Sequence, residues 1–177
     1  MSRANLTAAE AVAASALSLG AAAVVPAYLV YRAALRIEPF AVLVVSLVAA
    51  TVSFVTLRRR ATRTGAELAA FVSVLAAVFG WLLWLARPDL LPIGGRVDLT
   101  HHMVLINYIA RHWQLVYDPS LVPYLGDMIH YTPGAHLLIA LAARWTGADA
   151  LHAVHPVLAL TVALKSGLVF QIGRAHV

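Results

Sequence analysis

Three polar residues at helical spacing open the polar half of the chain: Asp98, His101 and His102. Steps of three and four residues place their side chains on one side of a helix's first turn. Because imidazole titrates near neutral pH, such a group can take part in proton transfer. Together with a later histidine it could also bind a metal ion, but no HExxH or similarly tight spacing is present. We therefore assign no metal ligand and leave metal binding as an alternative.

The same residues also have structural explanations. Asp98 stands directly before a periodic apolar run, where an aspartate is the usual helix N-cap. His101 and His102 would then be polar residues of a helix at the membrane surface. His152 and His155 lie one turn apart at a predicted membrane boundary, where we expect hydrogen bonds to neighbouring helices.

The element that positions the first group is a predicted amphipathic helix that ends near Gln114. Its apolar residues recur at steps of four and three and form one stripe: Leu99, Met103, Ile106, Ala110 and Trp113. The segment is too short and too polar to cross a membrane, which favours a helix lying along the surface. Turns rich in proline and glycine follow. A second helix is expected to start with Pro133 in its first turn and to end near Gly147.

Composition identifies the surroundings of these helices. Hydrophobic residues make up 62% of the 177 residues and charged residues 12%, and there is no cysteine. An average soluble domain has about 25% charged residues. The high hydrophobic fraction and the low charged fraction argue against a soluble globule and a disordered chain, and the absence of cysteine argues against a disulfide scaffold and a thiolate metal site. The sequence therefore predicts an integral membrane protein, and its basic charge carries no nucleic-acid-binding pattern.

Uncharged apolar runs at residues 11–30, 39–57 and 68–86 each match the ~20 residues that a helix needs to span a bilayer. A fourth hydrophobic segment covers about residues 150–170. Whether one or two crossings follow Pro133 stays open at this point. The connector RRRATR at residues 58–63 is the densest positive cluster, and the positive-inside rule places it in the cytoplasm. The amino terminus is then cytoplasmic as well, and Trp81 and Trp84 fall in an outer aromatic belt.

The predicted class is thus an all-α, polytopic transmembrane protein with an extracytoplasmic loop of juxtamembrane helices, in a bacterial plasma membrane. Residues 1–87 hold three transmembrane helices, residues 88–148 form the loop, and residues 149–171 form a further, truncated transmembrane segment. The last six residues, IGRAHV, match a translated sequencing adapter, so we expect residues 172–177 to be a non-native tail.

Two short motifs carry a resemblance to a known family. Residues 98–102 read DLTHH, and residues 130–141 read HYTPGAHLLIAL and lead to Gly147. They resemble the GT-C superfamily of polytopic glycosyltransferases, which includes protein O-mannosyltransferases and aminoarabinose transferases. Those proteins place an acidic residue in an extracytoplasmic loop, at the start of a juxtamembrane helix. A Tyr/His-Pro-Pro-type motif follows and leads into an apolar helix that ends at a glycine.

The resemblance implies transfer of a sugar from a polyprenyl-phosphate donor to an acceptor outside the membrane. It makes Asp98 the carboxylate that activates the acceptor hydroxyl, as a general base or through a bound divalent cation. His101 or His102 would orient that carboxylate or contact the phosphate. Four further residues are implied to bind substrate: Arg96, Arg111, Tyr131 and His136. The arginines would hold the donor phosphate by charge-assisted hydrogen bonds. Membrane lipids and the lipid-linked donor are the expected partners.

Two other functions remain open. A transporter or channel module would carry ionisable residues inside its spans, yet the first three apolar runs are uncharged. A non-catalytic membrane protein would use the histidine-rich loop to bind a metal ion or a partner.

Overall fold

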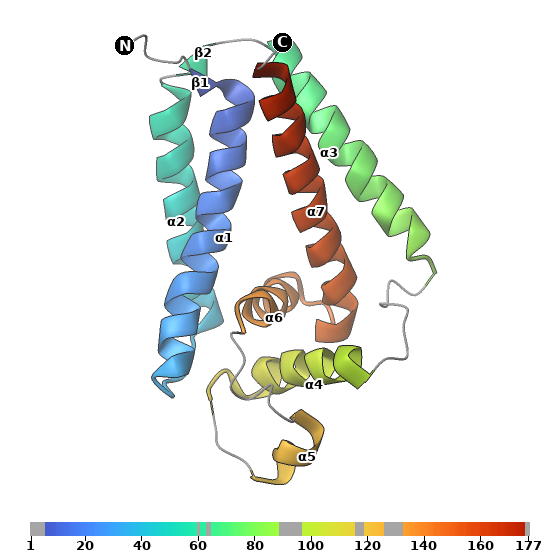
Figure 1. Ribbon diagram of the computed structural model, residues 1–177. Helices are drawn as coiled ribbons and strands as arrows, with labels where there is room; N and C mark the ends of the chain where they lie inside the picture. Colours follow the sequence, from blue (N-terminus) through green and yellow to red (C-terminus); the bar gives the residue numbers. More distant parts are fainter. Residues whose placement is uncertain are drawn as a thin grey trace.

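The computed structural model describes residues 6–59, 61–62, 65–88, 97–115, 119–125 and 133–175. The elements in chain order are β1 (Leu6–Thr7), α1 (Ala8–Arg32), α2 (Pro39–Arg58), β2 (Ala61–Thr62), α3 (Gly65–Leu85), α4 (Val97–His112), a 3-10 turn (Pro119–Leu121), α5 (Val122–Leu125), α6 (Gly134–Thr146) and α7 (Ala150–Ala175). Apart from one pair of two-residue strands, the described chain is helical (Figure 1). This confirms the predicted all-α class.

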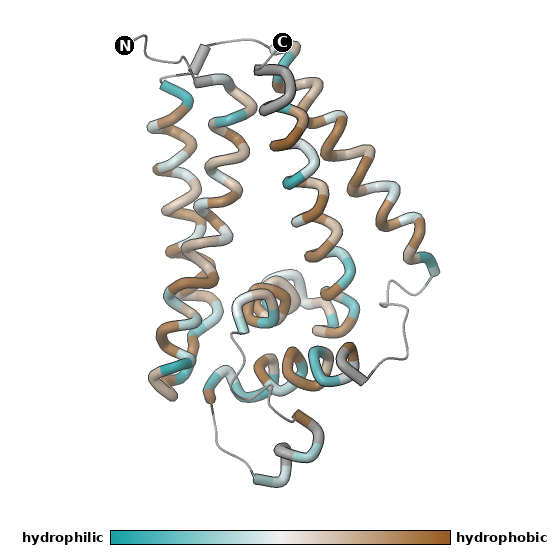
Figure 2. Tube along the Cα trace, in the orientation of Figure 1, coloured by the Kyte–Doolittle hydropathy of each residue, from teal (hydrophilic) through white to brown (hydrophobic). Residues whose placement is uncertain are grey.

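Four of these helices are long and apolar enough to cross a membrane: Ala8–Arg32, Pro39–Arg58, Gly65–Leu85 and Ala150–Gln171. Their apolar residues follow the helices along most of their length (Figure 2). Helix α6 has 13 residues and is too short to span. Within the described chain after Pro133, α7 is therefore the one candidate span. The chain is a helical integral membrane protein.

The start of α1 and the end of α7 lie at the same end of the bundle as the end of α2 and the start of α3 (Figure 1). There, β1 and β2 pair in parallel, with Leu6 opposite Ala61 and Thr7 opposite Thr62. Thr7 also caps α1 in a capping box with Glu10, in which each side chain accepts the other's backbone N–H. Helices α4, α5 and α6 lie at the opposite end. The arrangement has the sidedness that the charge pattern predicts, and the cytoplasmic assignment of the basic end remains a prediction.

The four spans form two antiparallel hairpins, α1 with α2 and α3 with α7 (Figure 1). In the first, the hydroxyls of Ser18 and Ser53 lie 3.0 Å apart. In the second, Gly167 allows a close approach, because a Cβ atom there would lie 2.7 Å from Cε2 of Phe71. The hairpins meet at the basic end, where Ala9 and Ala13 pack against Phe71.

Toward the opposite end the hairpins separate, and α6 lies between them with α4 across its outer side (Figure 1). One apolar cluster joins α1, α4 and α6 and includes Ala23, Ala27, Leu105, Ile109, Leu137 and Leu141. A second joins α4, α6 and α7 through Ile106, Ile139 and Val154. Although α6 is short, it is buried because helices surround it on several sides. We call α4 and α6 together the outer layer.

The connector between α1 and α2 anchors this outer layer. The backbone N–H of Ile37 donates to the carbonyl of Trp113, 2.7 Å away, just after α4 ends. The amide of Gln114 donates to the carbonyl of Ala34. The indole N–H of Trp145, near the end of α6, donates to the carbonyl of Pro39 at 2.8 Å. The end of α4 is thus fixed to the α1–α2 connector, and the end of α6 to the first residue of α2.

Candidate functional site

The contact that joins the two predicted motifs lies inside the outer layer. Nδ1 of His102 on α4 lies 2.7 Å from Nε2 of His136 on α6. The ring centroids are 5.0 Å apart, and the ring planes make an angle of 19°. This distance is that of a hydrogen bond between two imidazoles. The structure therefore brings together a residue from each motif.

Helical periodicity explains why these two rings meet. Leu105, Ile106 and Ile109 follow His102 by three, four and seven residues, so they share its side of α4. All three are buried in the clusters that contain α6. On α6, the neighbouring residue Leu137 is fully buried. The packing of the apolar faces of α4 and α6 thus determines how deeply His136 is buried between these helices.

Burial differs between the two imidazoles. His136 is 5% exposed, whereas His102 is only partly buried. Burial, together with a smaller effect of the nearby His102, lowers the pKa of His136 to about 4. His136 is therefore neutral at neutral pH. It acts in this state as a hydrogen-bonding group and carries no charge for a phosphate.

The remaining predicted site residues are distributed unevenly. His101 is partly buried beside His102, and Arg111 is exposed in the last turn of α4. Nine residues separate Arg111 from His102, which is about 13 Å along a helix axis. The structure thus does not bring Arg111 to the histidine pair. Arg96 and Tyr131 lie outside the described residues.

Asp98 lies in the first turn of α4, and its side chain is outside the described part. Because α4 begins at Val97, Asp98 is the second residue of the helix and does not stand at the N-cap. The prediction of an N-cap is wrong by this boundary. A smaller difference, of one residue, applies to Pro133, which stands at the N-cap of α6 rather than in its first turn. The predicted end of α6 is confirmed, since Gly147 follows it in the left-handed conformation with φ of 74°.

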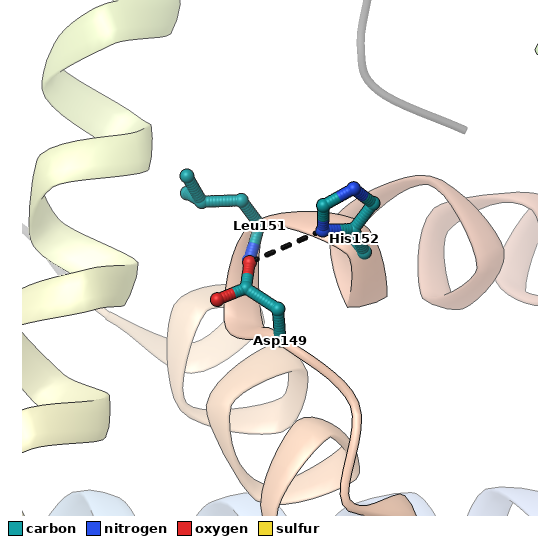
Figure 3. A network of polar contacts seen from close by, with 3 residues as sticks. All are labelled: Asp149, Leu151 and His152. Carbon is teal, nitrogen blue, oxygen red and sulfur yellow. Dashed lines mark hydrogen bonds and ion pairs between the residues drawn. The ribbon is translucent and has the colours of Figure 1, made fainter. Parts of the chain in front are cut away.

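The contact of His152 differs from its prediction. Its Nδ1 lies 3.3 Å from Oδ1 of Asp149, at the start of its own helix rather than on a neighbouring one (Figure 3). The same oxygen accepts the backbone N–H of Leu151 at 2.9 Å. The hydrogen bond from the Leu151 backbone is the main cause that lowers the pKa of Asp149, and the hydrogen bond with the His152 side chain lowers it further. Asp149 thus caps α7, because an aspartate before a helix satisfies its first N–H groups.

The prediction for His155 is confirmed. Its Nε2–H donates to the carbonyl of Leu82 on α3, 3.0 Å away. That carbonyl is one of the last four of α3, which have no donor within their own helix. His155 therefore stabilises the α3–α7 hairpin where the hairpin meets the outer layer.

Metal ligands do not gather in the described chain. Among the residues that the structure describes, no three His, Asp or Glu side chains lie close enough together to hold a metal ion. The described residues therefore provide no set of three ligands for the divalent cation that the sequence analysis allowed. The 2.7 Å spacing of His102 and His136 is itself that of a hydrogen bond.

Comparison with known proteins adds no relative: no family model, no curated protein and no solved structure matches the chain. The class that the fold defines is therefore a helical integral membrane protein with an outer layer of two short helices.

Proposed function

We propose that the protein is a membrane glycosyltransferase, or part of one, which transfers a sugar from a polyprenyl-phosphate donor to an extracytoplasmic acceptor. The observation that supports this proposal is the hydrogen-bonded pair of His102 and His136. It joins DLTHH on α4 to the motif that leads into α6. These are the two elements on which the resemblance to GT-C glycosyltransferases rests, and they lie 34 residues apart in the sequence.

The position of the outer layer suits a lipid-linked substrate. Helices α4 and α6 lie at one end of the spans, where the phosphate of a membrane lipid would lie (Figure 1). Trp81 and Trp84 stack with ring centroids 5.1 Å apart near the end of α3 and are both exposed. Paired exposed tryptophans at a helix end are typical of a membrane–water interface. A donor in the bilayer and an acceptor outside it can both approach this level.

The proposed reaction needs a base and a leaving group. The acceptor hydroxyl attacks the anomeric carbon of the sugar and forms the new glycosidic bond. The bond from that carbon to the phosphate oxygen breaks, and the lipid phosphate leaves with the electron pair. The Asp98 carboxylate takes the proton of the acceptor hydroxyl. Asp98 precedes His102 by four residues on α4, so the two positions share one side of that helix.

The decisive variant is Asp98→Asn in the complete protein, reconstituted in lipid nanodiscs. Sugar transfer is measured from a panel of polyprenyl-phosphate donors that includes mannose and aminoarabinose. We expect a loss of at least about 100-fold, because a positioned base contributes about that much or more. Glu38→Gln is the matched control, since Glu38 is an exposed carboxylate at the same end whose ion pair with Arg36 is long, at 3.8 Å.

The outcomes separate the claims. Full transfer by Asp98→Asn would refute the role of Asp98 as base. No transfer by the unaltered protein from any donor would argue against the glycosyltransferase. Solute flux in liposomes without a polyprenyl donor would instead support a transporter.

A further inference from the structure

The short distance between the two imidazoles limits where protons can lie. At 2.7 Å a single hydrogen fits between Nδ1 of His102 and Nε2 of His136. Either His102 donates from Nδ1, or His136 donates from Nε2. A second proton in the contact would set two N–H groups against each other. The pair therefore keeps its hydrogen bond with no net charge or with one positive charge, and loses it with two.

The two directions differ in what they permit. If His102 donates from Nδ1, its Nε2 can gain or lose a proton while the hydrogen bond stays intact. If His136 donates from Nε2, Nδ1 of His102 must stay unprotonated, so protonating His102 breaks the contact. Only the first direction is compatible with a charged His102.

Burial decides where the single charge resides. His136 is 5% exposed and His102 is only partly buried, so the charged form is less costly on His102. We propose that His136 is a positioning residue that holds His102 in one tautomer, with Nδ1–H donated to Nε2 of His136, so that Nε2 of His102 is the nitrogen that exchanges protons. Its use in sugar transfer rests on the proposed function, whereas the tautomer itself does not.

Several of the other titratable groups on the elements around the pair have contacts of their own. On α4, His101 directly precedes His102, and His112 contacts the carbonyl of Tyr108 at 3.1 Å. From α7, His155 binds an α3 carbonyl and His152 binds Asp149. Further titratable groups on the packed helices include Tyr28 and Tyr31 of α1, Tyr108 and Arg111 of α4, Lys165 of α7, and Arg144 of α6, which lies over Phe40. In the described chain, His102 is the group whose charge acts on His136.

The tautomer can be measured without any substrate. Nitrogen NMR of the full chain, labelled with 15N-histidine in nanodiscs, reports which ring nitrogen of each histidine carries a proton. We expect His102 to carry a proton on Nδ1 and His136 to leave Nε2 unprotonated at neutral pH. An unprotonated Nδ1 in His102 at neutral pH would overturn the assignment, and this measurement needs no variant.

Three variants test the positioning role. His136→Gln offers a side-chain carbonyl as acceptor near the place of Nε2, and we expect it to keep the tautomer of His102. His136→Leu offers no acceptor, and we expect a mixture of His102 tautomers. His112→Gln, the same substitution at an exposed site on α4, should change neither. An unchanged tautomer of His102 in His136→Leu would overturn the role of His136.

Transfer assays then distinguish this proposal from the proposed function. If the protein transfers sugar, His136→Leu should lower kcat by at least about tenfold and change its pH profile, and His136→Gln should restore both. A pH profile that is unchanged in His136→Leu would refute the positioning role even though transfer exists. If the protein transfers no sugar, the NMR result still decides whether the pair holds the proposed tautomer.

Discussion

The burial of His136 predicts that acid destabilises the folded protein by a definite amount. In the fold its pKa is about 4, against 6.5 for an ordinary histidine. The unfolded chain therefore binds a proton on this residue at a higher pH than the folded chain does. Stability is complete above the ordinary value, falls as the pH drops from 6.5 toward 4, and levels off below that.

The magnitude follows from the same two values. Each pKa unit corresponds to about 1.4 kcal/mol, so the difference amounts to about 3 kcal/mol at pH 4. Because the side chain is 5% exposed, solvent screens this effect little. A loss of this size is a large part of the stability of most proteins, about 5–15 kcal/mol.

The assay is equilibrium unfolding in mixed detergent micelles, followed by circular dichroism between pH 8 and pH 4. Other groups also titrate in this range, so the measured quantity is the difference between the unaltered protein and His136→Gln, which keeps a hydrogen-bonding group but cannot be protonated. We expect the unaltered protein to lose about 3 kcal/mol more than the variant. His152→Gln serves as control, because His152 is exposed at the start of α7. Parallel pH profiles for the unaltered protein and His136→Gln would refute the reasoning.

Three further predictions concern stability in the same assay. Gly167→Ala should lower the free energy of unfolding by about 1–3 kcal/mol, because the new Cβ would lie 2.7 Å from the buried ring of Phe71. Gly80→Ala is the control and should cost little, since a Cβ there meets nothing within 4 Å. Equal effects of the two substitutions would contradict the close packing at Gly167. Asp149→Ala should cost about 1 kcal/mol by removing the cap of α7, and Asp149→Asn should recover most of it. His155→Leu should cost about 1 kcal/mol because an α3 carbonyl loses its donor, and a neutral result would mean that the bond adds nothing.

The spans were predictable because each is a long apolar run with polar residues at both ends. The runs predicted at 11–30, 39–57 and 68–86 correspond to Ala8–Arg32, Pro39–Arg58 and Gly65–Leu85. The surface helix predicted from Leu99 corresponds to Val97–His112. Its buried side is centred on Leu105, Ile106 and Ile109, of which only Ile106 belongs to the predicted stripe. These features depend on periodicity and on residues close in sequence. The existence of these helices can therefore be predicted from the local sequence.

The arrangement of the outer layer was not predictable in this way. Both His102 and His136 stood out by type, but nothing in the sequence pairs residues 34 apart. Their contact exists because α6 is buried between two hairpins, and that position depends on packing among α1, α4 and α7. The partner of His152 was missed for the opposite reason. His152 contacts Asp149, the residue that caps its own helix, rather than a group on a distant helix.

The separation of the two hairpins at one end also has a consequence for the surrounding bilayer. The bundle is narrow where Ala9 and Ala13 meet Phe71, and wide where α6 lies between α1 and α7 (Figure 1). Such a protein is wedge-shaped and occupies a larger area in one leaflet than in the other. The lipids around the protein must therefore pack against a narrow end in one leaflet and a wide end in the other, and the wide end is the one that holds α6 and His136.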